Sequence, residues 1–149
     1  MQGYDPKKAA QVWQRVQGTG QPEQDGELLS LIAAELSASA AYLALSKRIP
    51  GKEAALRAMA EEEAAHAACL KGIYLLQTGQ RPAVQSPQPS QQTPEAALRR
   101  CYAGELGSIH AYQQRSGMAQ YGHIFAQMAL QEQRHSRTVL ELLGNLGGK

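Results

Sequence analysis

Apolar residues recur every three or four positions along four long stretches of the chain, the spacing that places them on one face of an α-helix. This pattern predicts helices over about 25–48, 52–77, 94–115 and 119–143. Polar residues interrupt the inward stripe of each helix. The four stripes are Leu28, Ile32, Glu35, Ser39, Tyr42 and Leu45 or Ser46; Leu56, Met59, Glu63, His66, Leu70 and Ile73; Leu98, Cys101 or Tyr102, Glu105, Ile109 and Tyr112; and Tyr121, Phe125, Met128, Glu132, His135, Val139 and Leu142.

The breaks between these helices differ in length. Ile49-Pro50-Gly51 and Ser116-Gly117 are short, so each joins two helices into an antiparallel hairpin. Residues 79–93 are rich in Pro, Gln and Ser, which predicts an extended connection without secondary structure. Such a segment spans about 50 Å when extended, whereas a helix of about 25 residues is about 38 Å long. The connection is therefore long enough to run along the whole helix pair.

Size and composition favour one all-α domain. The chain has 149 residues and a mass of 16.1 kDa, enough to bury a core without disulfides. Aromatic residues make up only 5%, and Ala and Leu supply much of the 43% hydrophobic content, as expected for helices that pack closely. We expect a short helix from Pro6 to about Gln17 and a loop within residues 1–20, followed by the helical bundle over 21–145.

Charge and cysteine usage exclude several classes of partner. A formal charge of +2 leaves no basic tract for nucleic acid and no polybasic patch for a membrane surface. The first residues lack the apolar core of a signal peptide, and no stretch approaches a membrane span, so we expect a cytoplasmic protein. Cys69 and Cys101 form no Cys-x-x-Cys motif, which predicts two buried thiols and no rubredoxin-like iron site within the chain.

Two copies of the pattern Glu-x-x-His lie on the inward stripes, at Glu63 and His66 and at Glu132 and His135. A carboxylate and an imidazole three residues apart share one helix face, so they can bind one metal ion together. A single such pair is common on exposed helix faces. Two pairs on apolar stripes indicate two halves of one site.

Each pair is preceded by a lone inward glutamate, Glu35 before the first and Glu105 before the second. A tyrosine follows each of these glutamates by seven residues, at Tyr42 and Tyr112, nearly in line along the helix. Glutamates and tyrosines therefore repeat together with the Glu-x-x-His pairs. The tyrosine hydroxyls are expected either to hydrogen-bond a ligand carboxylate across the site or to lie in the core as ordinary aromatic residues.

Four carboxylates in one core would repel one another and take up protons unless cations were present. Two divalent ions cancel four carboxylate charges, and oxygen with imidazole nitrogen suits iron or manganese better than structural zinc. We therefore predict a dinuclear iron site in which Glu63 and Glu132 bridge the ions. Glu62, four residues before His66, is expected in solvent or beside the ligands, and His110 and His123 at the surface. The predicted ligands are Glu35, Glu63, His66, Glu105, Glu132 and His135.

This ligand pattern is that of the di-iron carboxylate bundles, and residues 25 to 145 resemble the ferritin-like superfamily, within it the rubrerythrin-type proteins. The resemblance rests on Glu35 with Tyr42, MAEEEAAH over 59–66, Glu105 with Tyr112, and IFAQMALQEQRH over 124–135. It implies an antiparallel four-helix bundle of two hairpins with a long crossover between the second and third helices. It also implies a non-haem di-iron centre that reacts with hydrogen peroxide or dioxygen, an external electron donor such as a rubredoxin-like protein, and a homodimer.

The sequence departs from this family pattern at two positions. Rubrerythrins carry a second glutamate one turn after the third-helix ligand, where this chain has Ser108. The glutamate that takes part in the usual redox-linked change of metal ligand is therefore absent at this position. The position of the haem-binding methionine of bacterioferritins is Ala64, which disfavours haem, and the predicted helices are shorter than those of cage-forming ferritins, which disfavours a storage shell. The alternatives to a peroxidase are a ferroxidase or iron-handling protein, a metal-binding bundle without catalysis, and an enzyme that oxygenates an organic substrate.

Overall fold

The computed structural model describes residues 5–8, 25–88 and 91–147, and this part of the chain is helical with extended connections and no strand. Four long helices follow one another: α2 (Gly26–Ser46), α3 (Glu53–Thr78), α4 (Pro94–Arg115) and α5 (Gly122–Gly147). Residues 6–8 are also helical. The rest of the short N-terminal helix predicted to reach about Gln17, and its loop, lies outside the described residues.

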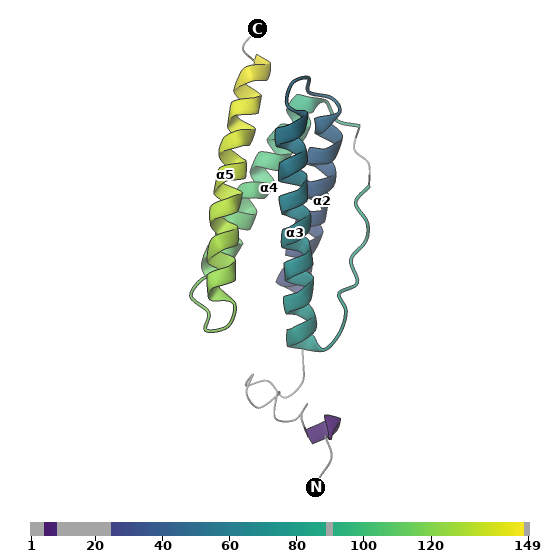
Figure 1. Cartoon of the computed structure of the whole chain (residues 1–149), viewed down its shortest axis with the longest axis vertical. Coiled ribbons are helices and arrows are strands. Elements are labelled where there is room, and N and C mark those ends of the chain that lie inside the picture. The colour runs from purple at the N-terminus through teal and green to yellow at the C-terminus, as the bar shows by residue number, and fades with distance from the viewer. Residues whose placement is uncertain (1–4, 9–24, 89–90, 148–149) are drawn as a thin grey trace.

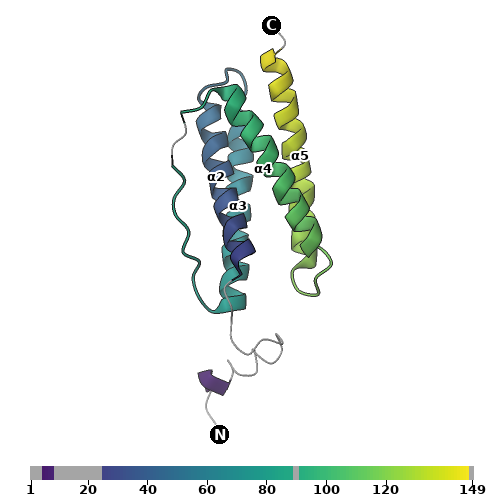
Figure 2. The same ribbon diagram turned by 180° about the vertical axis from the view of Figure 1, so that it is seen from behind.

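The helices form an all-α bundle of two hairpins (Figure 1). α2 packs along α3, α4 packs along α5, and the two hairpins meet mainly where α2 lies beside α4. The described residues of the connection from α3 to α4, 80–88 and 91–93, run along the outside of the first hairpin, as Figures 1 and 2 show from opposite sides. The prediction that this proline-rich segment can traverse the whole bundle is confirmed.

Three helix ends follow from local chemistry. The Asp25 side chain accepts a hydrogen bond from the backbone N–H of Leu28 and caps α2, and Thr93 caps α4 through the N–H of Ala96, with proline at the first helical position. α3 ends at Gly79, whose left-handed φ of 72° costs little without a side chain.

The start of the last helix was predicted wrongly. The expected start at about 119 lies in a turn, and Tyr121, expected on the inward stripe of the helix, precedes it with a left-handed φ of 65°. α5 then begins at Gly122, where an added Cβ would lie 2.5 Å from the carbonyl oxygen of Ser116. The close return of the chain onto Ser116 thus delays the helix. The helix also continues past the predicted end at 143 to residue 147.

The apolar core consists of two clusters. One lies around Ile32, Leu70 and Phe125, and the other around Leu45, Leu56 and Val139. In each helix, the metal-ligand candidates lie between residues of the first cluster and residues of the second. The polar residues therefore occupy the middle of the bundle, with an apolar layer toward each end.

α2 differs from expectation in its hydropathy. This helix of 21 residues contains an 18-residue window with a mean hydropathy of 1.7 and meets the length and composition of a membrane span, so the expectation that no stretch approaches one was wrong for this helix. The same helix carries Glu35, whose side chain is buried in the bundle. Length and composition of one helix leave the location of the protein open.

Candidate metal centre

The six predicted ligands meet in the middle of the bundle, and each is at most 5% exposed. They come from all four long helices, one glutamate each from α2 and α4 and a Glu-x-x-His pair each from α3 and α5. A carboxylate or imidazole three residues from its partner lies one turn along the same face, so each helix delivers its groups to one place. The residues brought together are Glu35, Glu63, His66, Glu105, Glu132 and His135.

These residues divide into two overlapping groups. Glu35 and His66 gather with Glu63 and Glu132, and Glu105 and His135 gather with the same two glutamates. Within each group, the candidate ligand atoms lie within 4.8 Å of one another. We call these the His66 half-site and the His135 half-site. Glu63 and Glu132 belong to both, which is the arrangement that two bridging carboxylates require.

Each of the six residues points one buried polar atom into the centre without a hydrogen-bond partner among the described residues. Both histidines do so with Nδ1, and the glutamates with one carboxylate oxygen each. Nδ1 of His66 lies 2.7 Å from Oε1 of Glu132 and 3.5 Å from Oε2 of Glu35, in orientations that form no hydrogen bond. Buried polar atoms without partners are rare and costly. A pair of cations would satisfy all six, so these residues fit a dinuclear metal site.

Two tyrosines cross-connect the hairpins at the centre. Tyr42 of α2 donates its hydroxyl to Oε1 of Glu105 on α4 over 2.6 Å, and Tyr112 of α4 donates to Oε1 of Glu35 on α2 over 2.5 Å. The predicted hydrogen bond from each phenol to a ligand carboxylate across the site is therefore confirmed. Burial and the adjacent carboxylates raise the pKa of both tyrosines, so their hydroxyls remain protonated donors.

The outer nitrogens of the two histidines have different partners. Nε2 of His135 forms a hydrogen bond with the carboxylate of Glu62, and Nε2 of His66 forms one with the amide oxygen of Gln131. Glu62 thus lies beside a ligand, one of its two predicted places. Gln131 was missed, although the repeat contains the signal: it precedes Glu132 just as Glu62 precedes Glu63.

Without cations the cluster retains protons. Burial raises the pKa of Glu63 to about 8, with Glu35 adding to the shift and His135 opposing it. Burial and neighbouring carboxylates also raise the pKa of Glu132. Burial alone would lower the pKa of His135, but Glu105 and Glu63 raise it to about 10. The centre therefore has to lose protons before cations can bind.

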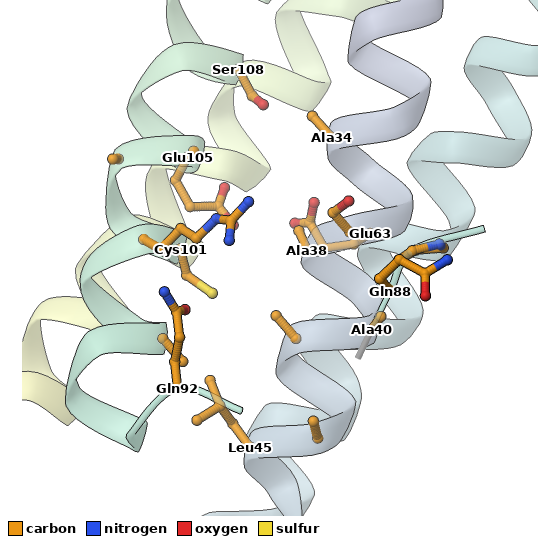
Figure 3. A pocket seen from close by; sticks show the side chains of 18 of the residues that line it. Ala34, Ala38, Ala40, Leu45, Glu63, Gln88, Gln92, Cys101, Glu105 and Ser108 are labelled. Carbon is orange, nitrogen blue, oxygen red and sulfur yellow. The ribbon is translucent and has the colours of Figure 1, made fainter. Parts of the chain in front are cut away.

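A pocket of about 1060 Å³ between α2 and α4 reaches the centre from one side. Three of its lining residues are Glu63 and Glu132, which both half-sites share, and Glu105 of the His135 half-site; Glu35, His66 and His135 do not line it. Figure 3 shows Glu105 and Glu63 at this pocket, with Cys101 one turn before Glu105. The two half-sites thus differ in whether their own glutamate lines the pocket, as Glu105 does and Glu35 does not, and in the partner of their histidine.

Other predicted positions follow the expected pattern with exceptions. His110 and His123 are exposed, as predicted. Cys101 is buried, but Cys69 is only half-buried, because it lies at the margin of its apolar cluster. On α4 Ser108 is buried, and Ile109, predicted to face inward, is half-buried.

No protein-family model, curated protein or solved structure matches the chain.

Proposed function

We propose that this chain is a rubrerythrin-type member of the ferritin-like superfamily that reduces hydrogen peroxide, or dioxygen, at a dinuclear iron centre. The observation that carries the proposal is the set of six buried candidate ligand atoms without a hydrogen-bond partner, grouped into two half-sites with two shared carboxylates. Oxygen and imidazole ligands suit iron, and manganese is the next metal that this donor set favours. The two hairpins and the crossover along the bundle support the ferritin-like assignment.

The ligands would hold the metals in a symmetric frame. Glu63 and Glu132 would bridge, because each belongs to both groups. Glu35 with His66 and Glu105 with His135 would complete the two positions. When bound as a ferrous pair, iron supplies the two electrons that reduce one peroxide to water. The bundle contributes a fixed set of ligands whose carboxylates balance the charge of two divalent ions.

The tyrosines supply positioned protons. Reduction of peroxide to two waters takes up two protons, and Tyr42 and Tyr112 each hold one at a ligand carboxylate. Their raised pKa values keep the phenols neutral, so each hydroxyl can hold its carboxylate in place by a hydrogen bond, while the two protons that the reaction consumes come ultimately from solvent. Cys69 and Cys101 form no rubredoxin-like motif, so we infer that electrons come from a separate carrier protein.

Stoichiometry tests the proposal. The anaerobic protein loaded with two ferrous ions should consume one peroxide for each pair of irons, and repeatedly so when a reductant is supplied. Glu63→Ala should lose this activity, whereas Glu61→Ala, a change at an exposed neighbour, should keep it. Undiminished turnover in Glu63→Ala would overturn the assignment. Oxidation of many irons per chain with mineral formation would establish a ferroxidase instead. If neither peroxide nor dioxygen oxidised the bound ferrous ions, the protein would be a metal-binding bundle without catalysis.

A further inference from the structure

The pocket between α2 and α4 is much larger than peroxide or dioxygen requires. Its volume is about 1060 Å³, whereas one water occupies roughly 30 Å³ in the liquid. Sites for organic ligands typically have volumes of about 300–1000 Å³. A route for a diatomic oxidant would need only a fraction of this space.

The walls of the pocket are made mostly of small apolar side chains, with four Ser and Gln side chains among them. On α2 these include Ala34, Ala38 and Ala41, and on the facing side of α4 they include Ala97 and Gly104. Figure 3 shows Ala34 and Ala38 on one side and Cys101 on the other. Such walls hydrogen-bond little and favour a hydrocarbon body.

The charged residues that line the pocket are of two kinds. Glu63, Glu105 and Glu132 are predicted metal ligands and are buried, so they mark the inner end. The others are Arg48 and Arg100, both exposed. Arg48 lies two residues after the end of α2, and Arg100 lies in the second turn of α4. Nη1 of Arg48 donates a hydrogen bond to the carbonyl of Gln92, just before α4, 2.7 Å away.

We propose that this pocket binds an aliphatic carboxylate, with its anionic group at Arg48 and Arg100 and its chain directed along the alanines toward the His135 half-site. Two guanidinium groups complement one carboxylate, and the walls complement the chain. Arg100 precedes Glu105 by five residues, a rise of about 7.5 Å along the helix, which a short aliphatic chain spans. The proposal extends the proposed function by assigning an organic ligand to the same centre, but binding itself does not require iron chemistry.

Binding of octanoate to the metal-free and the zinc-loaded protein tests this proposal by calorimetry. We expect one octanoate per chain, with octanol and octylamine at least tenfold weaker because they lack the negative charge. Arg48→Gln and Arg100→Gln should each weaken octanoate about fivefold, whereas Arg99→Gln, at an exposed neighbour outside the pocket, should not. Ala38→Leu should weaken it at least tenfold by filling the pocket, and Ala68→Leu on the exposed face of α3 should not.

The outcomes separate the two proposals. Octanoate binding that depends on Arg48, Arg100 and Ala38 supports the pocket assignment even if the iron-loaded protein fails to reduce peroxide. Failure of octanoate to bind, or binding that is equal in Ala38→Leu and Ala68→Leu, overturns the pocket assignment and leaves the peroxide reaction untouched. Tighter binding of octylamine than of octanoate would overturn the role of the arginines.

Discussion

Glu62 accepts a hydrogen bond from Nε2 of His135, whereas the equivalent nitrogen of His66 bonds the amide of Gln131. A carboxylate behind a metal-binding imidazole makes it a stronger donor to the metal than a neutral amide does. The internal repeat is therefore symmetric in its ligands and asymmetric in the groups that support them.

This asymmetry predicts unequal metal affinities. Glu62→Gln should weaken the tighter of the two metal-binding steps by roughly tenfold, and Gln131→Glu should strengthen the weaker step. Competitive titration of cobalt(II) against a chelator, followed by absorbance, measures both constants. Glu61→Gln, at an exposed neighbour, is the matched control. Two constants that stay the same in Glu62→Gln would show that this hydrogen bond does not distinguish the half-sites.

Loss of one tyrosine hydroxyl should lower stability without removing metal. Tyr42→Phe deletes the hydrogen bond to Glu105 and leaves a buried carboxylate oxygen with fewer partners. The free energy of unfolding of the metal-free protein should fall by about 1–3 kcal/mol, while metal analysis should still find two ions per chain. Tyr102→Phe, at a half-buried position on α4, should change neither quantity measurably. A metal content of one or less in Tyr42→Phe would contradict the expectation.

The stability of the metal-free protein should decrease as the pH rises. The pKa of Glu63 is raised from 4.5 to about 8 and that of His135 from 6.5 to about 10. When the pKa of a group is higher in the folded than in the unfolded state, the folded state binds more protons. The contribution of that group to the free energy of unfolding is fully present below the unfolded-state pKa and is lost as the pH rises through the folded-state pKa. Thermal unfolding of the metal-free protein at pH 5, 6, 7 and 8 should show a falling midpoint.

Binding of metal should make the protein more stable as the pH rises, the reverse of the metal-free protein, because cations displace the protons that the cluster holds. Calorimetric titration with zinc at pH 7, in buffers of different ionisation enthalpy, should report net proton release. Titration of Glu63→Gln should release fewer protons. Proton uptake on binding, or a midpoint that rises with pH in the metal-free protein, would contradict the assigned direction of the shifts.

Two glycines of α5 should respond in opposite ways to alanine. At Gly122 a Cβ would lie 2.5 Å from the carbonyl oxygen of Ser116, so Gly122→Ala should destabilise the protein by about 1–3 kcal/mol through displaced backbone. At Gly144 a Cβ meets nothing within 4 Å, and Gly144→Ala should stabilise by up to about 1 kcal/mol. Chemical denaturation of the two variants gives the comparison. Equal changes in the free energy of unfolding for the two variants would show that the turn before α5 accommodates the added Cβ without loss of stability.

Sequence reasoning identified what depends on helical periodicity. The positions of Glu35, Glu63 and His135 follow from which residues share a helix face, and the cap at Thr93 follows from its side chain and the proline after it. The repeat also supported the choice of Glu63 over Glu62 as a ligand. These features are local, because the residues that determine each of them lie within one or two helical turns of one another in the sequence.

Features that depend on contact between distant segments were less predictable. The left-handed Tyr121 and the close approach of Gly122 to Ser116 arise from how the turn folds back on itself. The bond from Gln131 to His66 joins α5 to α3, and the pocket is lined by residues of both hairpins and of the crossover. Periodicity within one helix contains no information on such distances.

The crossover has a consequence for how the centre could be assembled. It joins the hairpins covalently, yet each hairpin alone supplies three of the six proposed ligands, and none of the six comes from the crossover. A chain cut within residues 79–93 would leave two fragments, each with half of the coordination set. Capture of metal would then become a bimolecular event, and the ions would hold the fragments together as a complementing pair whose affinity depends on fragment concentration.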